Sequence, residues 1–228
     1  MSAVHSARER ILGRLRATTI ADAPALPDVK AWFDAHRRND DQPQRVQRLR
    51  TALEAAHAEV HDCTPSDWPE LLLRIAAAKQ VRRLLIGAGT PHGAMLEARD
   101  PEGLQLLRFE EPIASWRDAL FDQVDASLTL ARSAIAETGS LVLWPSASEP
   151  RLMSLVPPLH FVLVDATTIH ADLHATLTAE AWTDGMPTNA LLISGPSKTA
   201  DIQQTMAYGA HGPRELVVLM LHGLGARP

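Results

Sequence analysis

The chain has 228 residues, a length that fits one domain or one domain with a small appendage. Lysine and arginine total 22 against 27 aspartates and glutamates, so the net charge is −5 and the positive surface of a polybasic nucleic-acid-binding protein is missing. The single cysteine, Cys63, excludes an internal disulfide. One thiol also cannot hold an iron–sulfur cluster, which needs several cysteine ligands.

The start of the chain and its hydropathy favour a cytoplasmic protein. No apolar run of signal-peptide length follows Met1, and no stretch approaches the roughly 20 apolar residues that a membrane span needs. We therefore expect a protein with no membrane span and no nucleic-acid partner.

Residues 1–42 are predicted to form an N-terminal helical arm. Ser6 and Glu9 fit a capping box at the start of a helix over about 6–17, and a proline-containing loop follows it. The arm has too little apolar surface for a core of its own. We expect it to pack on the main domain or on a second subunit, in which case it would build a homodimer.

From Pro43 to the end, residues 43–228 alternate predicted helices and strands, taken here in chain order. Helices are predicted over about 45–58, from 67, and over 93–99, 116–123, 169–177 and 199–204, and strands over 59–63, 84–87, 104–109, 127–130, 134–136, 140–143, 160–165, 190–194 and 216–221. Many strands are apolar on both faces, which is typical of an α/β sheet covered on both sides. The strands over 127–130, 134–136 and 140–143 are so close that they predict a tight antiparallel or bulged element.

The loop that follows the strand over 190–194 is the strongest candidate for a binding site, because ligands of open α/β sheets bind beyond the carboxyl ends of the strands. Ser197 or Thr199 can cap the predicted helix, and the free amides at its start, together with Lys198, would hold a small anion. The alternative is a well-capped helix without a ligand.

Three further loops carry candidate chemistry. Glu137, in a turn with Gly139, can serve as nucleophile or base, unless it is only an exposed hairpin glutamate. His211, in a glycine- and proline-containing turn, can donate a hydrogen bond or carry a proton, unless the turn only redirects the chain. Arg151 can clamp a carboxylate or phosphate, unless it forms a surface ion pair. The glycine-rich turn at 87–90 matches half of a dinucleotide fingerprint, which is weak evidence for a nicotinamide site.

The order of these loops resembles the lactate utilization protein C family, whose members carry a LUD domain. The resemblance spans roughly 80–225 and is carried by four segments: Ala136–Leu143, Arg151 with Ser154–Pro157, Ser194–Ser197 with Thr199–Ile202, and Gly209–Pro213. The departures are mild, with Ser140 where threonine is frequent and Ala210 where valine is frequent.

The resemblance implies the fold of the sugar-phosphate isomerases and CoA-transferases, a Rossmann-like mixed sheet flanked by helices. It also implies a subunit that supports oxidation of L-lactate to pyruvate together with iron–sulfur partner proteins, which would hold the clusters, whereas no cofactor of its own is evident. The candidate catalytic residues are Glu137 and His211, no metal ligands are predicted, and the candidate ligand-binding residues are Thr138, Gly139, Arg151, Ser194, Gly195, Ser197, Lys198, Thr199, Asp201 and Gly212.

Two other functions stay open. The spacing of Glu137 and Gly139 resembles that of CoA-transferases, which form an acyl intermediate on a glutamate, so the chain could be an acyl- or phosphoryl-transfer enzyme in its own right. It could also be a scaffold without chemistry that pairs subunits through its arm.

Overall fold

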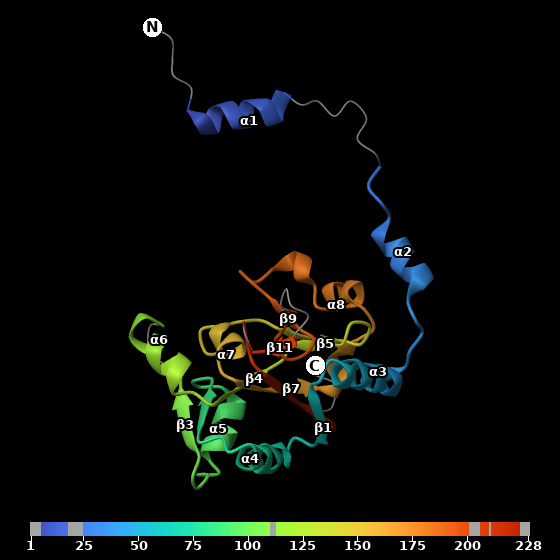
Figure 1. The fold of residues 1–228 in the computed structure, drawn as a ribbon. Coiled ribbons are helices and arrows are strands. Elements are labelled where there is room, and N and C mark those ends of the chain that lie inside the picture. Colours follow the sequence, from blue (N-terminus) through green and yellow to red (C-terminus); the bar gives the residue numbers. More distant parts are fainter. Residues whose placement is uncertain (1–5, 18–24, 110–112, 201–205, 210, 224–228) are drawn as a thin grey trace. The chain divides into compact units, whose positions relative to one another are not determined.

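Six parallel strands form the main sheet of the computed structural model. The structure describes residues 6–17, 25–109, 113–200, 206–209 and 211–223 (Figure 1). The order of the strands across the sheet is β1 (Glu59–Cys63), β12 (Glu215–Leu221), β7 (Leu159–Asp165), β4 (Ala126–Leu130), β2 (Arg83–Ile86) and β3 (Gln105–Arg108). All seven residues of β7 are buried, as its continuous apolar run predicts for an inner strand covered on both faces.

The direction in which successive strands are added to the sheet reverses at β2. Along the chain, β3 adds to one side of β2, and β4 then adds to the other side, each parallel to it. A reversal of this kind is the topological switch point of an open sheet, where ligands bind beyond the carboxyl ends of the strands. The glycine-rich turn that follows β2 lies at this point.

Helices cover one face of the main sheet. Trp68 and Leu72 of α4 (Trp68–Ala78) and Leu96 of α5 (Pro91–Glu97) share a buried cluster with Phe161 and Leu163 of β7. All are less than 9% exposed, and burial of a side chain of this size stabilises the fold by about 1.5–3 kcal/mol.

The opposite face of the sheet carries helices and a second sheet. Val162 and Val164, which alternate with the residues facing α4, cluster with Leu49 and Leu53 of α3 (Gln42–Ala55). Beside them lie α6 (Ile113–Asp122) and α7 (Leu152–Leu155), which pack on β2 and β3. The main sheet is therefore covered on both sides, as the sequence predicts.

The second sheet has four strands in the order β8 (Ile169–His170), β5 (Ser133–Ile135), β6 (Ser140–Leu143) and β9 (Leu191–Ile193). β5 and β6 form an antiparallel hairpin, β6 pairs antiparallel with β9, and β5 pairs parallel with β8. The 3₁₀ turns η1 (Ala166–Thr168) and η2 (Trp182–Asp184) connect the elements around this sheet.

Two predictions for this part of the chain are wrong. The strand near 127–130 does not join the hairpin of β5 and β6, because β4 pairs with β2 and β7 in the main sheet. The helix predicted over 169–177 is divided. Ile169 and His170 form a strand, and Asp172 then accepts a 2.7 Å hydrogen bond from the Ala175 amide and starts α8 (Leu173–Ala179).

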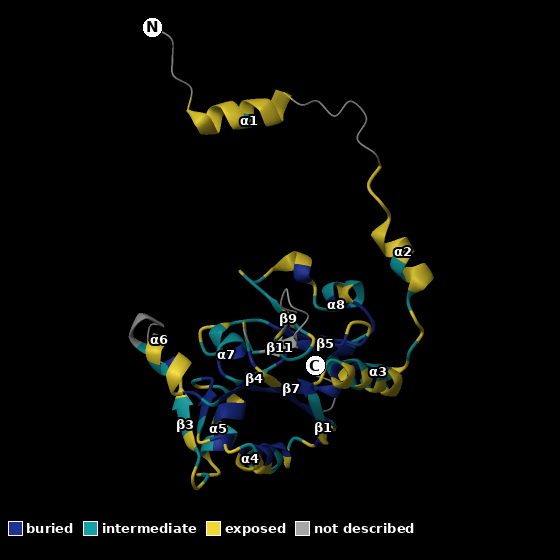
Figure 2. Ribbon diagram, viewed as in Figure 1, coloured by how far each residue is buried: buried dark blue, intermediate teal, exposed yellow. Residues whose placement is uncertain are grey.

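The chain divides into two units, Met1–His36 and Arg37–Pro228. The first contains α1 (Ala7–Ala17) and α2 (Val29–His36), and none of the residues of these two helices is buried (Figure 2). Ser6 and Glu9 form the predicted capping box, with 2.7 and 3.2 Å hydrogen bonds. In the described part of the chain, no helix has both the length and the apolar composition needed to cross a bilayer.

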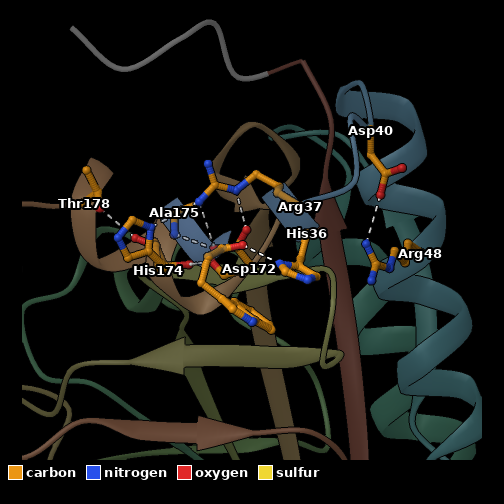
Figure 3. A network of polar contacts seen from close by, with 10 residues as sticks. His36, Arg37, Asp40, Arg48, Asp172, His174, Ala175 and Thr178 are labelled. Carbon is orange, nitrogen blue, oxygen red and sulfur yellow. Dashed lines mark hydrogen bonds and ion pairs between the residues drawn. The ribbon is translucent and has the colours of Figure 1, made fainter. Parts of the chain in front are cut away.

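Arg37 holds the start of the second unit against α8 (Figure 3). Its Nε donates to Asp172 Oδ2 at 2.5 Å, and its Nη2 lies 3.2 Å from His174 Nδ1. Asp172 is 3% exposed, and although burial raises the pKa of its carboxyl, the hydrogen bonds from Arg37 and Ala175 outweigh burial and lower it.

Candidate functional site

The turn that contains Glu137 and Gly139 lies on the last turn of α3. Gly139 has φ +66°, and a Cβ added there would come 2.6 Å from the Cβ of Ala52. A Cβ added at Gly195, after β9, would come 2.9 Å from the Cβ of Ala56. These two glycines therefore let two of the predicted loops approach the same helix end.

Three hydroxyl groups connect these two loops. Ser140 Oγ lies 2.7 Å from Thr138 Oγ1 and 2.7 Å from Ser194 Oγ. Ser140 is 4% exposed, whereas Thr138 and Ser194 are exposed. The antiparallel pairing of β6 with β9 brings the hydroxyls together, and the chain of three can present donors and acceptors at the surface while its middle member stays buried.

Ser197 and the glycine-rich loop around His211 form one unit. The Ser197 amide donates to Pro213 O at 2.8 Å, and the Gly209 amide donates to Ser197 O at 3.0 Å. A Cβ added at Gly212 would come 3.1 Å from Ser197 Cβ and 3.7 Å from the carbonyl oxygen of Leu155, in the helix that follows Arg151. These contacts link segments from all four predicted loops. We call the surface that they form the motif-loop surface, and it consists of residues 137–140, 151–155, 194–198, 209 and 211–213.

The helix predicted over 199–204 is wrong at its start. Lys198–Ala200 form strand β10, which pairs antiparallel with β11 (Met206–Tyr208), while residues 201–205 lie outside the described residues. No helix begins at Ser197 or Thr199, and the Ser197 amide is already used by Pro213, so the predicted anion site of free helix amides does not form there. The pairing of β10 with β11 determines the strand conformation of Lys198–Ala200, which the intrinsic preferences of these residues alone did not predict.

The charged residues predicted for the site lie at the surface. Glu137, Arg151, Lys198 and His211 are all exposed. The Glu137 amide donates to Ala171 O at 3.0 Å, which fixes the backbone of the turn but leaves the carboxylate at the surface. The side chain of Thr199 and the whole of Asp201 lie outside what the structure describes. A partner or ligand that touches this surface would meet both charge signs.

The fold and the motif-loop surface can now be compared with known proteins. The family model described as LUD domain matches residues 46–221, which contain the main sheet, the second sheet, the β10–β11 pair and the whole motif-loop surface. The chain belongs to the LUD domain family.

Relatives of this LUD domain match along almost its whole length. An uncharacterized protein, NMB1437, of Neisseria meningitidis is 39% identical over 95% of this chain and 94% of its own length. A lactate utilization protein C of Exiguobacterium sp. is 34% identical over 95% of this chain and 96% of its own length. The crystal structure of a DUF162 family protein from Deinococcus radiodurans is similar in fold, with a TM-score of 0.61 at 23% identity, covering 80% of this chain and 99% of that one.

The LUD domain also contains a polar pair of a buried histidine and a partly buried glutamate, which the sequence patterns did not predict. His92 Nε2 lies 2.8 Å from Glu149 Oε1, and the same oxygen accepts a 3.3 Å hydrogen bond from the Leu130 amide at the end of β4. A Cβ added at Gly87 would come 2.8 Å from Glu149 Cγ. The pair therefore ties the glycine-rich turn after β2 to the end of β4 across the switch point. The signal in the sequence was a histidine two residues after the turn at 87–90.

A second unpredicted polar group lies inside the LUD domain. His160 on β7 is completely buried, its Nε2 lies 2.8 Å from Thr129 Oγ1, and its Nδ1 has no hydrogen-bond partner among the described residues. Burial lowers the pKa of His160 to about 3, so the ring is neutral at ordinary pH. On the neighbouring strand, Ser127 Oγ donates to the carbonyl of Met153. These polar groups lie between two hydrophobic clusters on one face of the main sheet.

Proposed function

We propose that this LUD domain is a subunit of an L-lactate utilization system, and that it supports oxidation of L-lactate to pyruvate together with iron–sulfur partner proteins. The observation that carries the proposal is the match to a lactate utilization protein C over 95% of the chain. The match includes every loop of the motif-loop surface, which argues that the relative and this chain use that surface in the same way.

The chemistry of the chain supports a role beside partners that hold the redox groups. Cys63 is the only cysteine, and it is 5% exposed with its Sγ 3.5 Å from Met220 O. Burial raises the pKa of Cys63 to about 12, so the thiol stays protonated. The cysteine ligands of an iron–sulfur cluster would therefore come from partners, and the exposed, mixed-charge motif-loop surface suits contact with them.

A growth experiment tests the proposal. Deletion of the gene in the source organism should abolish growth on L-lactate and leave growth on pyruvate intact, because pyruvate enters metabolism after the oxidation. The gene should restore growth when supplied in trans, and a tagged chain should copurify with iron–sulfur proteins. Unimpaired growth on L-lactate, with no other lactate dehydrogenase in the strain, would refute the proposal.

Acyl or phosphoryl transfer at Glu137 is the second candidate function, because this carboxylate is exposed on a turn held by Gly139 against α3. Incubation with an acyl-CoA followed by hydroxylamine should then leave a hydroxamate on Glu137. Absence of this product, with a CoA-transferase as positive control, removes the candidate.

A separate observation supports a scaffold role for the arm. Ile11 and Leu15 of α1 and Trp32 of α2 are 60%, 66% and 56% exposed, so the arm offers apolar side chains to a second subunit. Light scattering should show a smaller assembly for a chain that lacks residues 1–42, and an unchanged assembly would rule the arm out as the contact.

A further inference from the structure

A cavity of about 290 Å³ lies at the amino-terminal edge of the main sheet, opposite the edge that carries the switch point. Its lining comes from the turn after α4, at residues 79–81, from Asp125 directly before β4, and from the starts of β7 and β12. These segments meet because the strands are parallel, so that all of them begin at the same edge. None of the lining residues belongs to the motif-loop surface.

Arg214, directly before β12, supplies a positive charge to the cavity. Its backbone is fixed, because its amide donates to Pro158 O at 2.7 Å. Its side chain lies against Gly209, where an added Cβ would collide with Arg214 Cγ, so glycine makes room for the stem of the arginine. The neighbouring Glu215 is bound by Lys79, whose Nζ lies 2.7 Å from Glu215 Oε2. Among the described residues, the guanidinium of Arg214 has no hydrogen bond or ion pair, and it can hold a carboxylate with two parallel N–H donors.

Asp125 supplies a carboxylate that is held in place but only half used. Its Oδ2 accepts hydrogen bonds from the amides of Arg82 and Arg83, at 2.9 and 2.8 Å. Its Oδ1 accepts none within the described part of the chain, so this oxygen can bind a ligand cation. The charges of the lining balance, with two cations and two anions: Lys79, Arg214, Asp125 and Glu215. A cavity that is neutral as a whole but offers a guanidinium and a carboxylate oxygen matches a zwitterion.

Gln80 supports a binding role, because it occupies a backbone position that favours glycine. Its φ is +59°, and it ends α4 in a Schellman motif, in which the amides of Gln80 and Val81 donate to Ala77 O and Ala76 O at 3.0 and 2.9 Å. A side chain at such a position strains the backbone, and strain of this kind is concentrated at functional sites. Gln80 lines the cavity, and its side-chain amide can both donate and accept a hydrogen bond there.

The size and the wall of the cavity limit the zwitterion to a small one with an apolar part. The volume corresponds to about ten water-sized groups, so an α-amino acid of about nine or ten non-hydrogen atoms fits. Val81 and Leu159 are the buried apolar residues of the wall, 8% and 4% exposed, and Pro158 lies beside Leu159. An uncharged, apolar side chain is favoured next to such a wall.

We infer that this cavity binds a free α-amino acid with an apolar side chain, its carboxylate on Arg214 and its ammonium group on Asp125. The inference goes beyond the proposed function and does not depend on it, since it rests on the lining of the cavity alone. A bound amino acid would immobilise Arg214 against Gly209, which belongs to the motif-loop surface. Occupancy of the cavity would therefore be coupled to the surface at which partners are expected.

Isothermal titration calorimetry on the full chain tests the site with L-leucine and two analogues. The analogue 4-methylpentanoate lacks only the ammonium group, and 3-methylbutylamine lacks only the carboxylate, so each should bind at least about tenfold more weakly than L-leucine. Arg214→Gln should weaken L-leucine binding by about tenfold or more. Asp125→Asn keeps an oxygen for the two backbone amides and should reduce the preference for L-leucine over 4-methylpentanoate. Arg74→Gln removes an exposed positive charge of α4 outside the lining and should leave binding unchanged.

Gln80→Gly keeps the test independent of charge and of a failure to fold. It removes the side-chain amide from the cavity and relieves the left-handed backbone at the end of α4. It should therefore weaken L-leucine binding by about threefold or more and at the same time raise the melting temperature by about 1–4 °C. A glutamine without a binding role would give the second change and not the first.

Binding of L-leucine by the wild type, with the losses expected for both analogues and for the Arg214 and Gln80 variants, would establish the site. The inference is overturned if the wild type does not bind L-leucine, if either analogue binds equally well, or if Arg214→Gln or Gln80→Gly binds like the wild type.

Discussion

Acidification should destabilise this protein through His160 before its carboxylates begin to titrate. The ring is completely buried on β7, the strand between β4 and β12, and burial lowers its pKa to about 3 from the ordinary value of 6.5. In the unfolded chain the imidazole takes up a proton below its ordinary pKa, whereas in the folded chain it stays neutral. The stability that His160 contributes is therefore complete above about pH 6.5 and is lost as the pH falls toward 3.

The size of the effect follows from proton linkage. One proton taken up only by the unfolded state lowers the free energy of unfolding by about 1.4 kcal/mol per pH unit. Between pH 6.5 and pH 5, the loss from this one ring is about 2 kcal/mol, a large part of a typical total of about 5–15 kcal/mol. Carboxyl groups contribute little in this window because their pKa values lie lower.

Urea unfolding followed by tryptophan fluorescence measures the effect, because Trp68 and Trp182 are buried. The free energy of unfolding should fall by about 2 kcal/mol more between pH 6.5 and pH 5 for the wild type than for His160→Gln, which keeps a hydrogen-bonding group near Thr129 but does not titrate. The other nine histidines are common to both chains and cancel in the comparison. Equal pH slopes for the two chains would refute the assignment of a buried neutral ring.

Three further predictions concern single residues. Gly139→Ala should lower the free energy of unfolding by about 2–4 kcal/mol, because Gly139 combines a left-handed backbone with a close approach to α3. Gly89→Ala should lower it by only about 1–2 kcal/mol, because Gly89 has a left-handed backbone but open surroundings. Equal losses for the two variants in urea unfolding would contradict this difference. Asp172→Ala should lower the melting temperature more than Asp172→Asn, because asparagine keeps the helix cap, and identical melting temperatures for the two variants would exclude a capping role. The stability that the charged pair of Asp172 and Arg37 contributes should persist above the ordinary pKa of an aspartate and be lost as the pH falls below it. Iodoacetamide at pH 8 should label Cys63 only after unfolding, and fast labelling of the native chain, read by mass spectrometry, would show that the thiol is not buried.

Local sequence patterns predicted most of the elements of this fold. Runs such as Leu84–Ile86 and 216–221 are apolar on both faces and became inner strands, because only a sheet covered on both sides buries such runs. The predictions failed where pairing partners decided the outcome. Ile169 lies in a strand because Ala134 pairs with it, and Lys198–Ala200 form a strand because residues 206–208 pair with them.

The sequence by itself determined the α/β class, the order of the motif loops and the resemblance to lactate utilization proteins, because these depend on residues that are near one another along the chain. Only the tertiary structure decided which side chains meet. The pairing of β6 with β9 joins Ser140 to Ser194, and the pairing of β2 with β3 places Arg108 beside the glycine-rich turn. Contacts of this kind depend on strand order and register, which are set by the burial of the whole sheet rather than by any local pattern.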